Sequence, residues 1–343
     1  MRHEKRLYAI ILTILMIAAS LINISYCSST ATAVQNGGID REPVALRPDL
    51  ATMFKPNAGK FYGKTFSDLY EAVQKSLPED PVRVLITYDQ PSSESFLQAI
   101  RSRVDLNLKI NYVCKYIPVV ACELPAGKLK ELENFKEVQA LWLDKPKYLA
   151  SLDGLESRLS RIDFLTLQRS YIDSERLCLN DSARIIGAQS LWDVGVNGSG
   201  VTIAFIDTGI NKTHPDFYFP DGKSKIIKEV SFVPNEDPMD YYGHGTHCAG
   251  IAAGTGVASK GKFKGIAPGA SLMNIKIFSK RGFTSDEWIL AALEYVIDVH
   301  PDIISMSWGG PAAPESDPVN ALVKEIVKRG IIAVAAAGNN AYY

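Results

Sequence analysis

The 343-residue sequence has little cysteine and almost no net charge. Five cysteines are too few for a fold held together by disulfides. The net charge of −1 shows no basic excess of the kind typical of nucleic-acid binding. The sequence also has no acidic run of the kind that would predict a disordered tail. Apolar residues make up 46% of the chain, as in an ordinary globular protein, and the length suggests about two domains. We therefore expect no nucleic-acid partner.

Two of the cysteines lie close together in the sequence. Cys114 and Cys122 flank Pro118 and could face each other across a hairpin. A disulfide and two buried thiols both stay open, because an exported protein permits the first and an apolar core the second.

Only the first 33 residues contain a long apolar run. Three basic residues among the first six are followed by apolar residues over 7–22 and by Ala-Thr-Ala ending at Ala33. This order is typical of a cleaved signal peptide, and the run is short for a full membrane span. We expect a secreted protein without membrane contact after cleavage. The alternative is an uncleaved anchor in the cell envelope.

The next stretch divides into an extension and a small domain. Residues 34–80 are rich in Gly, Pro and charge, and predict an N-terminal extension. Residues 81–148 predict a β-α-β-β-α-β unit, an α+β ferredoxin-like domain. Its strands are expected at 82–88, 110–116, 119–124 and 138–142, and its helices at 92–104 and 127–135. Alternate residues from Val82 to Tyr88 are expected on one face of the first strand, and Val138, Ala140 and Trp142 on one face of the last. Phe96 and Ile100 stand at helical spacing in the first helix. Glu137 and Asp144, near its end, are expected to be solvated.

After a charged connector at 149–183, the pattern changes again. Short apolar strands alternate with helices from residue 184 onward, which predicts a parallel sheet with helices on both faces. The strands are expected at 201–207, 226–232, 272–278, 303–308 and 331–337. A capping box from Thr284 to Glu287 predicts a helix over 288–299. Asp317-Pro318 starts the next helix, and Gly330 ends it.

Three polar residues stand at the ends of these elements. Asp207 ends the first apolar strand, His244 begins a helical run among small residues, and Asn339 follows the last strand. Alone, Asp207 and Asn339 are more simply turn residues. A metal site is the alternative for the histidine, since His247 lies three residues on, but the glutamate of an H-E-x-x-H motif is absent.

Taken together, these segments resemble one family. Residues 200–209, 243–250 (Gly-His-Gly-Thr-His-Cys-Ala-Gly), 304–310 and 334–339 resemble, in this order, the motifs of subtilisin-like serine proteases. The resemblance runs from about residue 184 to the end of the sequence. It implies an incomplete subtilisin-like sheet and an endopeptidase that hydrolyses peptide bonds with an Asp/His/Ser triad.

The resemblance also implies roles for individual residues. His244 would be the general base, Asp207 would orient it, and Asn339 would donate to the oxyanion. Cys248 resembles the thiol of the proteinase K branch and is expected to be buried. The walls of the substrate cleft would be formed by Ser307, Trp308 and Gly309 on one side and by Ala336, Ala337 and Gly338 on the other.

The small domain fits the same resemblance. Residues 81–148 resemble the inhibitor-type propeptide of the family, which helps the catalytic domain to fold and places its tail in the cleft until it is cleaved. A slowly folding parallel sheet gives a physical reason for such a helper. We therefore expect a secreted zymogen, inhibited by its own propeptide, with a processing site between 149 and 183.

One motif of the family is absent from the sequence. The nucleophile segment Gly-Thr-Ser-Met-Ala does not occur, and Ser305 and Ser307 lie in a predicted strand. We expect the serine beyond residue 343, so that residues 1–343 alone lack triad activity. The rival hypotheses are a non-catalytic peptide-binding module and a metal-dependent hydrolase built on His244, His247 and Asp207.

The chemistry requires no cofactor, and a structural calcium ion is left open. Asp216 matches a calcium ligand of the family. Residues 255–263, which would supply the partner oxygens, contain lysines and no Asn or Asp. This calcium site is either altered or lost, and calcium elsewhere stays open.

Overall fold

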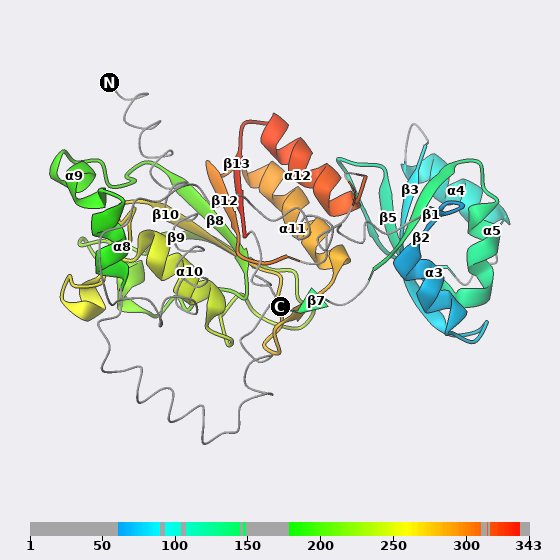
Figure 1. Cartoon of the computed structure of the whole chain (residues 1–343), viewed down its shortest axis with the longest axis horizontal. Helices are drawn as coiled ribbons and strands as arrows, with labels where there is room; N and C mark the ends of the chain where they lie inside the picture. Colours follow the sequence, from blue (N-terminus) through cyan, green and yellow to red (C-terminus); the bar gives the residue numbers. More distant parts are fainter. Residues whose placement is uncertain are drawn as a thin grey trace, which may run out of the picture. The chain divides into compact units, whose positions relative to one another are not determined.

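The computed structural model describes residues 61–89, 93–103, 108–144, 147–148, 178–309, 314 and 316–336 (Figure 1). The expected signal peptide and residues 149–177 of the connector lie outside these ranges, as does most of the extension. The chain divides into two compact units, which are described separately. The larger one includes residues 146–309 and 323–343, and the smaller one residues 25–145 with 310–322.

The smaller unit is built on a six-stranded sheet with the order β1-β2-β6-β3-β5-β4. The four strands β6-β3-β5-β4 pair antiparallel and, with α4 and α5, form the predicted β-α-β-β-α-β arrangement. The elements are β1 (Phe61–Tyr62), β2 (Thr65–Phe66), α3 (Ser67–Gln74), β3 (Pro81–Tyr88), α4 (Ser93–Arg103), β4 (Lys109–Val113), β5 (Val119–Pro125), α5 (Leu129–Glu133) and β6 (Val138–Leu143).

The core of this unit follows the predicted periodicities. The alternate residues of β3, from Val82 to Tyr88, are buried on one face of the sheet. Phe96 and Ile100, one turn apart on α4, are also fully buried. The rings of Tyr88 and Phe96 stack with centroids 4.2 Å apart, which fixes α4 against the sheet.

The sheet begins earlier than residue 81, where the small domain was expected to start. β1 and β2 join it, with β2 parallel to β6, and α3 follows β2. Phe61 and Phe66 pack against Trp142, at centroid distances of 5.1 and 4.8 Å. Two-residue strands are too short to show a periodicity, so this extension of the sheet left no pattern in the sequence.

The end of the unit differs from the prediction in two ways. The register shifts in β6, where Tyr88 pairs with Val138 but Thr87 pairs with Ala140. Past this bulge Leu141, rather than Ala140, joins the core beside Val138. The prediction that Glu137 and Asp144 are solvated was wrong: both are buried, and Asp144 accepts a hydrogen bond from Arg83 Nε at 3.1 Å.

Cys114 and Cys122 are two separate buried thiols. Cys122 pairs across the sheet with Ile110, whereas Cys114 donates its backbone N–H to Val119. The register therefore places the two cysteines at different levels of the hairpin. Burial raises the pKa of the Cys122 thiol to about 12, as expected for an unreactive core cysteine.

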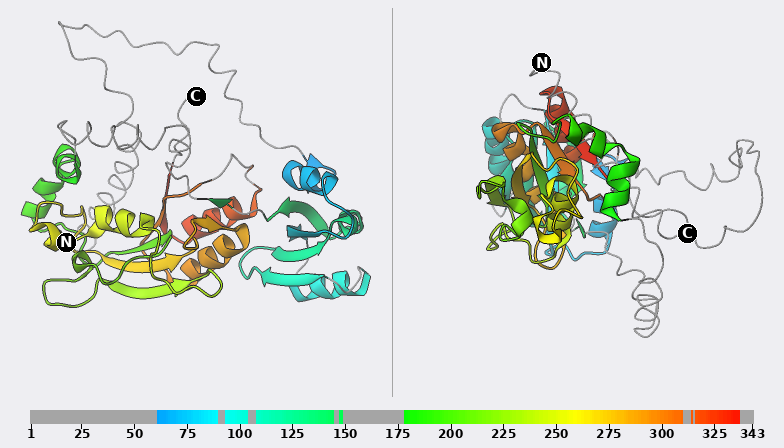
Figure 2. Two further views of the ribbon diagram at one scale, coloured as in Figure 1. Left: turned by 90° about the horizontal axis from the view of Figure 1, so that it is seen from below. Right: turned by 90° about the vertical axis from the view of Figure 1, so that its left-hand side faces the viewer.

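The larger unit contains a five-stranded parallel sheet with the order β13-β12-β8-β10-β9 (Figure 1). This confirms the predicted α/β class with a parallel sheet. The left view of Figure 2 shows its green to yellow strands β8, β9 and β10 side by side. The elements are β7 (Lys147–Tyr148), α8 (Leu179–Ile185), α9 (Ala188–Asp193), β8 (Thr202–Asp207), β9 (Ile226–Ser231), α10 (His244–Ala253), β10 (Ser271–Lys276), β11 (Phe283–Thr284), α11 (Asp286–Val299), β12 (Ile303–Met306) and β13 (Ile332–Ala335). The helix α12 (Pro318–Lys328) begins in the range assigned to the smaller unit and ends in that of the larger one.

Small side chains let α10 lie close to this sheet. Ala249, Ala252 and Ala253 are buried in one cluster with Ile203 and Phe205 of β8. Because β8 is the central strand, this packing brings the start of α10 to the carboxyl ends of the strands, where parallel sheets place their functional residues.

The helix starts match the sequence signals closely. Asp317 Oδ1 accepts from the N–H groups of Val319 and Asn320, as predicted for the start of α12. For α11 the cap is Ser285 and not Thr284, which belongs to β11. Thr284 pairs with Lys147 in the strand, so the hydroxyl of the next residue, Ser285, takes the cap. In the described part of the chain, no helix is long and apolar enough to cross a membrane.

Replacing Phe96 by alanine should destabilise the smaller unit by about 3–5 kcal/mol, because it removes a fully buried ring and leaves a cavity. Hydrogen exchange of the β3 and β5 amides would measure the loss of protection. Leu77→Ala is the control, since Leu77 is 61% exposed, and it should leave these amides protected. Equal effects of the two substitutions would contradict the assigned core.

Candidate active site

The site is built around the carboxylate at the end of the central strand. Asp207 is the last residue of β8 and is 1% exposed. Its Oδ1 accepts a hydrogen bond from the N–H of Thr208 at 2.7 Å. The carboxylate is thus held by its own turn and has little rotational freedom.

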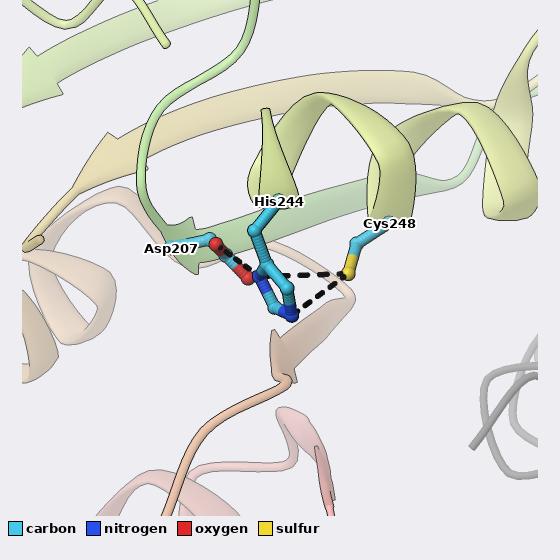
Figure 3. A group of neighbouring side chains, drawn as sticks. All are labelled: Asp207, His244 and Cys248. Atoms are coloured by element: carbon cyan, nitrogen blue, oxygen red, sulfur yellow. Dashed lines mark hydrogen bonds and ion pairs between the residues drawn. The ribbon is translucent and has the colours of Figure 1, made fainter. Parts of the chain in front are cut away.

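The partner of this carboxylate is a histidine from α10. His244 is the first residue of the helix, and its Nδ1 lies 2.7 Å from Asp207 Oδ1 (Figure 3). The two residues are 37 positions apart in the sequence. The histidine side chain is 30% exposed whereas that of Asp207 is 2% exposed. The pair therefore has one buried and one accessible member, as a proton-transfer site requires.

Glycine is needed where the helix meets the strand. A Cβ atom on Gly245 would lie 2.2 Å from the carbonyl oxygen of Gly209, so any side chain there would push α10 away from β8. The Gly245 N–H donates to Thr208 Oγ1 at 2.8 Å. The glycine after His244 therefore permits the approach, and the threonine after Asp207 fixes it.

A second carboxylate holds the start of α10. Asp240 Oδ1 accepts from the N–H groups of Tyr242 and Gly243, at 2.9 and 2.7 Å. Its Oδ2 accepts from the N–H and hydroxyl of Thr246, at 2.9 and 2.6 Å. Burial opposes the charge, but these hydrogen bonds lower the pKa of Asp240 below its usual value. Asp240 satisfies amides on both sides of His244 and so limits its movement.

A buried lysine supports the turn after Asp207. Lys276 ends β10 beside Asp207, and its Nζ donates to the carbonyl of Thr208 at 2.6 Å. It is fully buried, and burial lowers its pKa, opposed by Glu236 at 3.5 Å. The turn is therefore fixed through the N–H, the hydroxyl and the carbonyl of Thr208.

The carboxylate changes the proton affinity of the histidine. Burial lowers the pKa of His244, but the hydrogen bonds with Asp207 and Cys248, and the charge of Asp207, raise it overall above its usual value. Asp207 thus stabilises the imidazolium form and fixes which ring nitrogen carries the inner proton. Such a pair can accept a proton at the outer nitrogen and hold the charge that results.

Cys248 lies one turn further along α10. Its Sγ is 3.9 and 4.0 Å from the two ring nitrogens of His244, and the side chain is half-buried rather than fully buried (Figure 3). The sulfur lies beside the imidazole ring at about the same distance from both nitrogens. The outer nitrogen, Nε2, therefore does not point at the sulfur.

The residues that could form a metal site in the structure differ from the set expected from the sequence. Among the described residues, the group that could hold an ion is Asp207, His244 and Cys248, whereas His247 is exposed and lies outside it. In this group His244 Nδ1 and Asp207 Oδ1 already share a hydrogen bond. The arrangement therefore favours a hydrogen-bonded Asp–His pair over a metal site.

The structure describes four of the six predicted cleft residues. Ser307, Trp308 and Gly309 follow β12, next to β8, and Trp308 Nε1 donates to the carbonyl of Ile206 at 2.7 Å. Ala336 follows β13 and donates its N–H to the carbonyl of Met306. These segments therefore follow the carboxyl ends of the strands on one side of Asp207. Ala337, Gly338 and Asn339 lie outside the described residues.

The donors around Asp216 do not fit a calcium ion. The Asp216 carboxylate accepts from the N–H of Ala258 at 2.8 Å, and its carbonyl accepts from the N–H of Thr255 at 3.0 Å. Calcium needs several oxygen ligands, but the facing loop offers N–H donors and carries Lys260 and Lys262. Amides occupy the place of the calcium ion that the family resemblance implies, in agreement with a site that is altered or lost.

Sequence reasoning missed three residues that position the pair, namely Thr208, Asp240 and Lys276. Asp240, four residues before His244, is the kind of residue that caps a helix start and could have been found by that signal. Thr208 and Lys276 carried no signal, because their roles depend on contacts between separate strands and helices.

Comparison with known proteins places these residues in context. Residues 198–342 match the subtilase family. The chain is 37% identical over 180 residues to the major intracellular serine protease of Bacillus subtilis (strain 168), covering 49% of this chain and 53% of that protein. It is 27% identical over 225 residues to the minor extracellular protease Vpr of the same organism, covering 64% and 26%.

Among solved structures, the fold is similar to that of fervidolysin from Fervidobacterium pennivorans, described as a keratinolytic enzyme related to subtilisin. The TM-score is 0.53 at 22% identity, over 77% of this chain and 40% of that one. The likeness shows the fold alone. The chain spans about half or less of the length of these relatives.

Replacing Asp207 by asparagine should lower the pKa of His244, because the imidazolium loses its partner while burial still opposes its charge. An NMR titration of the ring protons would measure the change. Asp193→Asn, at an exposed carboxylate, is the control and should leave the titration unaltered.

The same pair should make stability depend on pH. A raised folded-state pKa stabilises the protein fully below the unfolded value of about 6.5, and the contribution is lost as pH rises through the folded-state value. The difference in unfolding free energy between the parent and Asp207→Asn should therefore be larger at about pH 6 than at about pH 9. A constant difference would contradict the pairing.

Proposed function

We propose that this chain, whose residues 198–342 form a domain of the subtilase family, belongs to a serine endopeptidase made as an exported zymogen. The observation that carries the proposal is the 2.7 Å contact between Asp207 and His244 at the carboxyl end of the central strand. The serine proteases among its relatives support the reaction class.

In this proposal His244 accepts the proton of a serine hydroxyl as the oxygen attacks the peptide carbonyl. Asp207 holds the ring and stabilises the imidazolium, which then gives the proton to the leaving amine. The printed sequence contains no Gly-Thr-Ser-Met-Ala segment, and we assign the serine to sequence beyond residue 343. Asn339 would donate to the oxyanion, where the loss of one donor lowers the rate by roughly 10²–10³.

The substrate would be a peptide in extended conformation. Ser307, Trp308 and Gly309 would pair with one side of it, and Ala336, Ala337 and Gly338 would line the cleft further on. The hydrogen bond of Trp308 to Ile206 supports this assignment, because it ties the first of these segments to the strand that carries Asp207.

The zymogen proposal rests on the smaller unit and on the segment that follows it. The unit has the predicted ferredoxin-like strand order and its own core. Shortly after it, β7 pairs antiparallel with β11 in the larger unit. We interpret β7 as the tail of a propeptide that inhibits the enzyme until the chain is cut between 149 and 183.

Export is proposed from the sequence of residues 1–33. The relatives include both a protein named intracellular and one named extracellular, so they support neither location alone. The basic start, apolar run and Ala-Thr-Ala segment favour the extracellular one.

We propose that Asp216 holds its loop without calcium. Adding calcium or a chelator should leave the thermal midpoint of the chain unchanged. Asp216→Asn should lower that midpoint in both conditions, because the N–H of Ala258 loses a charged acceptor. A calcium-dependent rise that Asp216→Asn abolishes would contradict this. A rise that persists in the variant would place calcium elsewhere in the protein.

The central test uses the product of the complete reading frame. His244→Ala should abolish peptide hydrolysis and leave the smaller unit covalently attached, since no group remains to accept the serine proton. Peptide hydrolysis and the appearance of the cut chain on a gel are the two measurements. His247→Ala is the matched control, because it changes an exposed histidine of the same helix. Full activity of His244→Ala would overturn the proposal.

A further inference from the structure

The pairing of β7 with β11 contains a side-chain contact that the proposed reaction does not use. Tyr148 pairs with Phe283, and Lys147 pairs with Thr284, in an antiparallel register. Main-chain pairing of this kind accepts almost any sequence, so selectivity for a peptide in this position must come from side chains.

The side chain of Lys147 forms an ion pair with Asp286. The ammonium Nζ donates to Asp286 Oδ1, and the two side chains are only 19% and 8% exposed. Both charges are therefore largely withdrawn from water. A peptide with a neutral side chain in this position would lose the ion pair, and an acidic one would bring two like charges together with little water between them, which makes the contact selective.

The acidic member is fixed by its place in the fold. Asp286 is the first residue of α11, a helix of 14 residues, directly after the cap Ser285. The free N–H groups at a helix start stabilise a negative charge. Asp286 also follows β11 by two positions, so the strand that pairs with β7 and the carboxylate are adjacent in the sequence.

The direction of β7 relates this contact to the reaction. β7 comes immediately before the segment 149–183, in which the processing cut is expected. A peptide lying as β7 does would therefore place Lys147 on the N-terminal side of the bond that is cut. The propeptide segment would then serve as an internal copy of the preferred substrate.

We propose that β11 and Asp286 form a subsite that selects a lysine or arginine on the N-terminal side of the scissile bond. This rests on the proposed function, since it names the substrate class of that same site. The protease would prefer extended peptides with a basic residue at one fixed position, and Lys147 would occupy the subsite in the zymogen.

The first experiment measures selectivity with the product of the complete reading frame. Peptides carrying lysine, arginine, norleucine or glutamate at each position upstream of the cut are compared by kcat/KM. Norleucine matches the lysine stem without its charge. At one position lysine and arginine should exceed norleucine by roughly tenfold, a difference of about 1.4 kcal/mol.

Variants of the enzyme identify the residue responsible. Asp286→Asn should remove the preference, and Asp286→Lys should reverse it in favour of glutamate, with changes at that position alone. Glu287→Gln is the matched control, because Glu287 is the other acidic residue in the first turn of α11. It should keep the preference for the basic residue. Preference that survives Asp286→Asn would overturn the inference.

A second experiment is independent of catalysis and uses the 343-residue chain. Hydrogen exchange of the Thr284 amide reports whether β7 is docked, because the Phe283 N–H donates to Ser279 Oγ within the larger unit. Lys147→Glu and Asp286→Lys should each reduce protection, and the double substitution should restore it. If the double substitution restores protection but the product of the complete reading frame hydrolyses no peptide, the proposed function is wrong and the charge-selective contact is supported. Hydrolysis without charge preference, and no rescue by the double substitution, would overturn the subsite alone.

Discussion

The hydrogen bond between Asp207 and His244 is the contact on which the site depends. It requires the end of a strand and the start of a helix to meet within 2.7 Å, although the residues lie 37 positions apart. That approach is possible because Gly245 has no side chain where the carbonyl of Gly209 lies. The alanines of α10 extend the close fit along the sheet. Backbone proximity is thus the structural condition for the chemistry.

Charge is arranged around this contact so that each buried group has a partner. Asp240 receives four hydrogen bonds around the start of α10, and Lys276 joins the Thr208 carbonyl to Glu236. Buried charges without partners are strongly unfavourable, so these contacts both stabilise the unit and fix the geometry of the pair. Rigidity here supports the proposed proton transfer, which needs donors and acceptors already in position. Substrate selection, by contrast, is assigned to Asp286 on a different helix.

Much of the fold followed from periodicity in the sequence. The alternation in β3 and the helical spacing of Phe96 and Ile100 predicted the core of the smaller unit, because burial on one face requires those spacings. The strands of the larger unit were found from their apolar runs. The pattern did not reveal β1 and β2, because two-residue strands are too short for a period. It also did not reveal the bulge in β6, which moves every later residue of that strand to the other face. Asp144 was misjudged for a related reason, since its partner Arg83 lies on another strand.

For the site itself, the sequence alone identified the two candidate residues. Asp207 and His244 stand at element ends and lie in motifs that resemble one family, so their identity was available before any coordinates. Only the tertiary structure decided how they are held. The roles of Thr208, Asp240 and Lys276, the amides that surround Asp216 and the pairing of Lys147 with Asp286 all depend on contacts between distant segments. Local patterns encode the period of an element, whereas such contacts arise only when separate elements pack together.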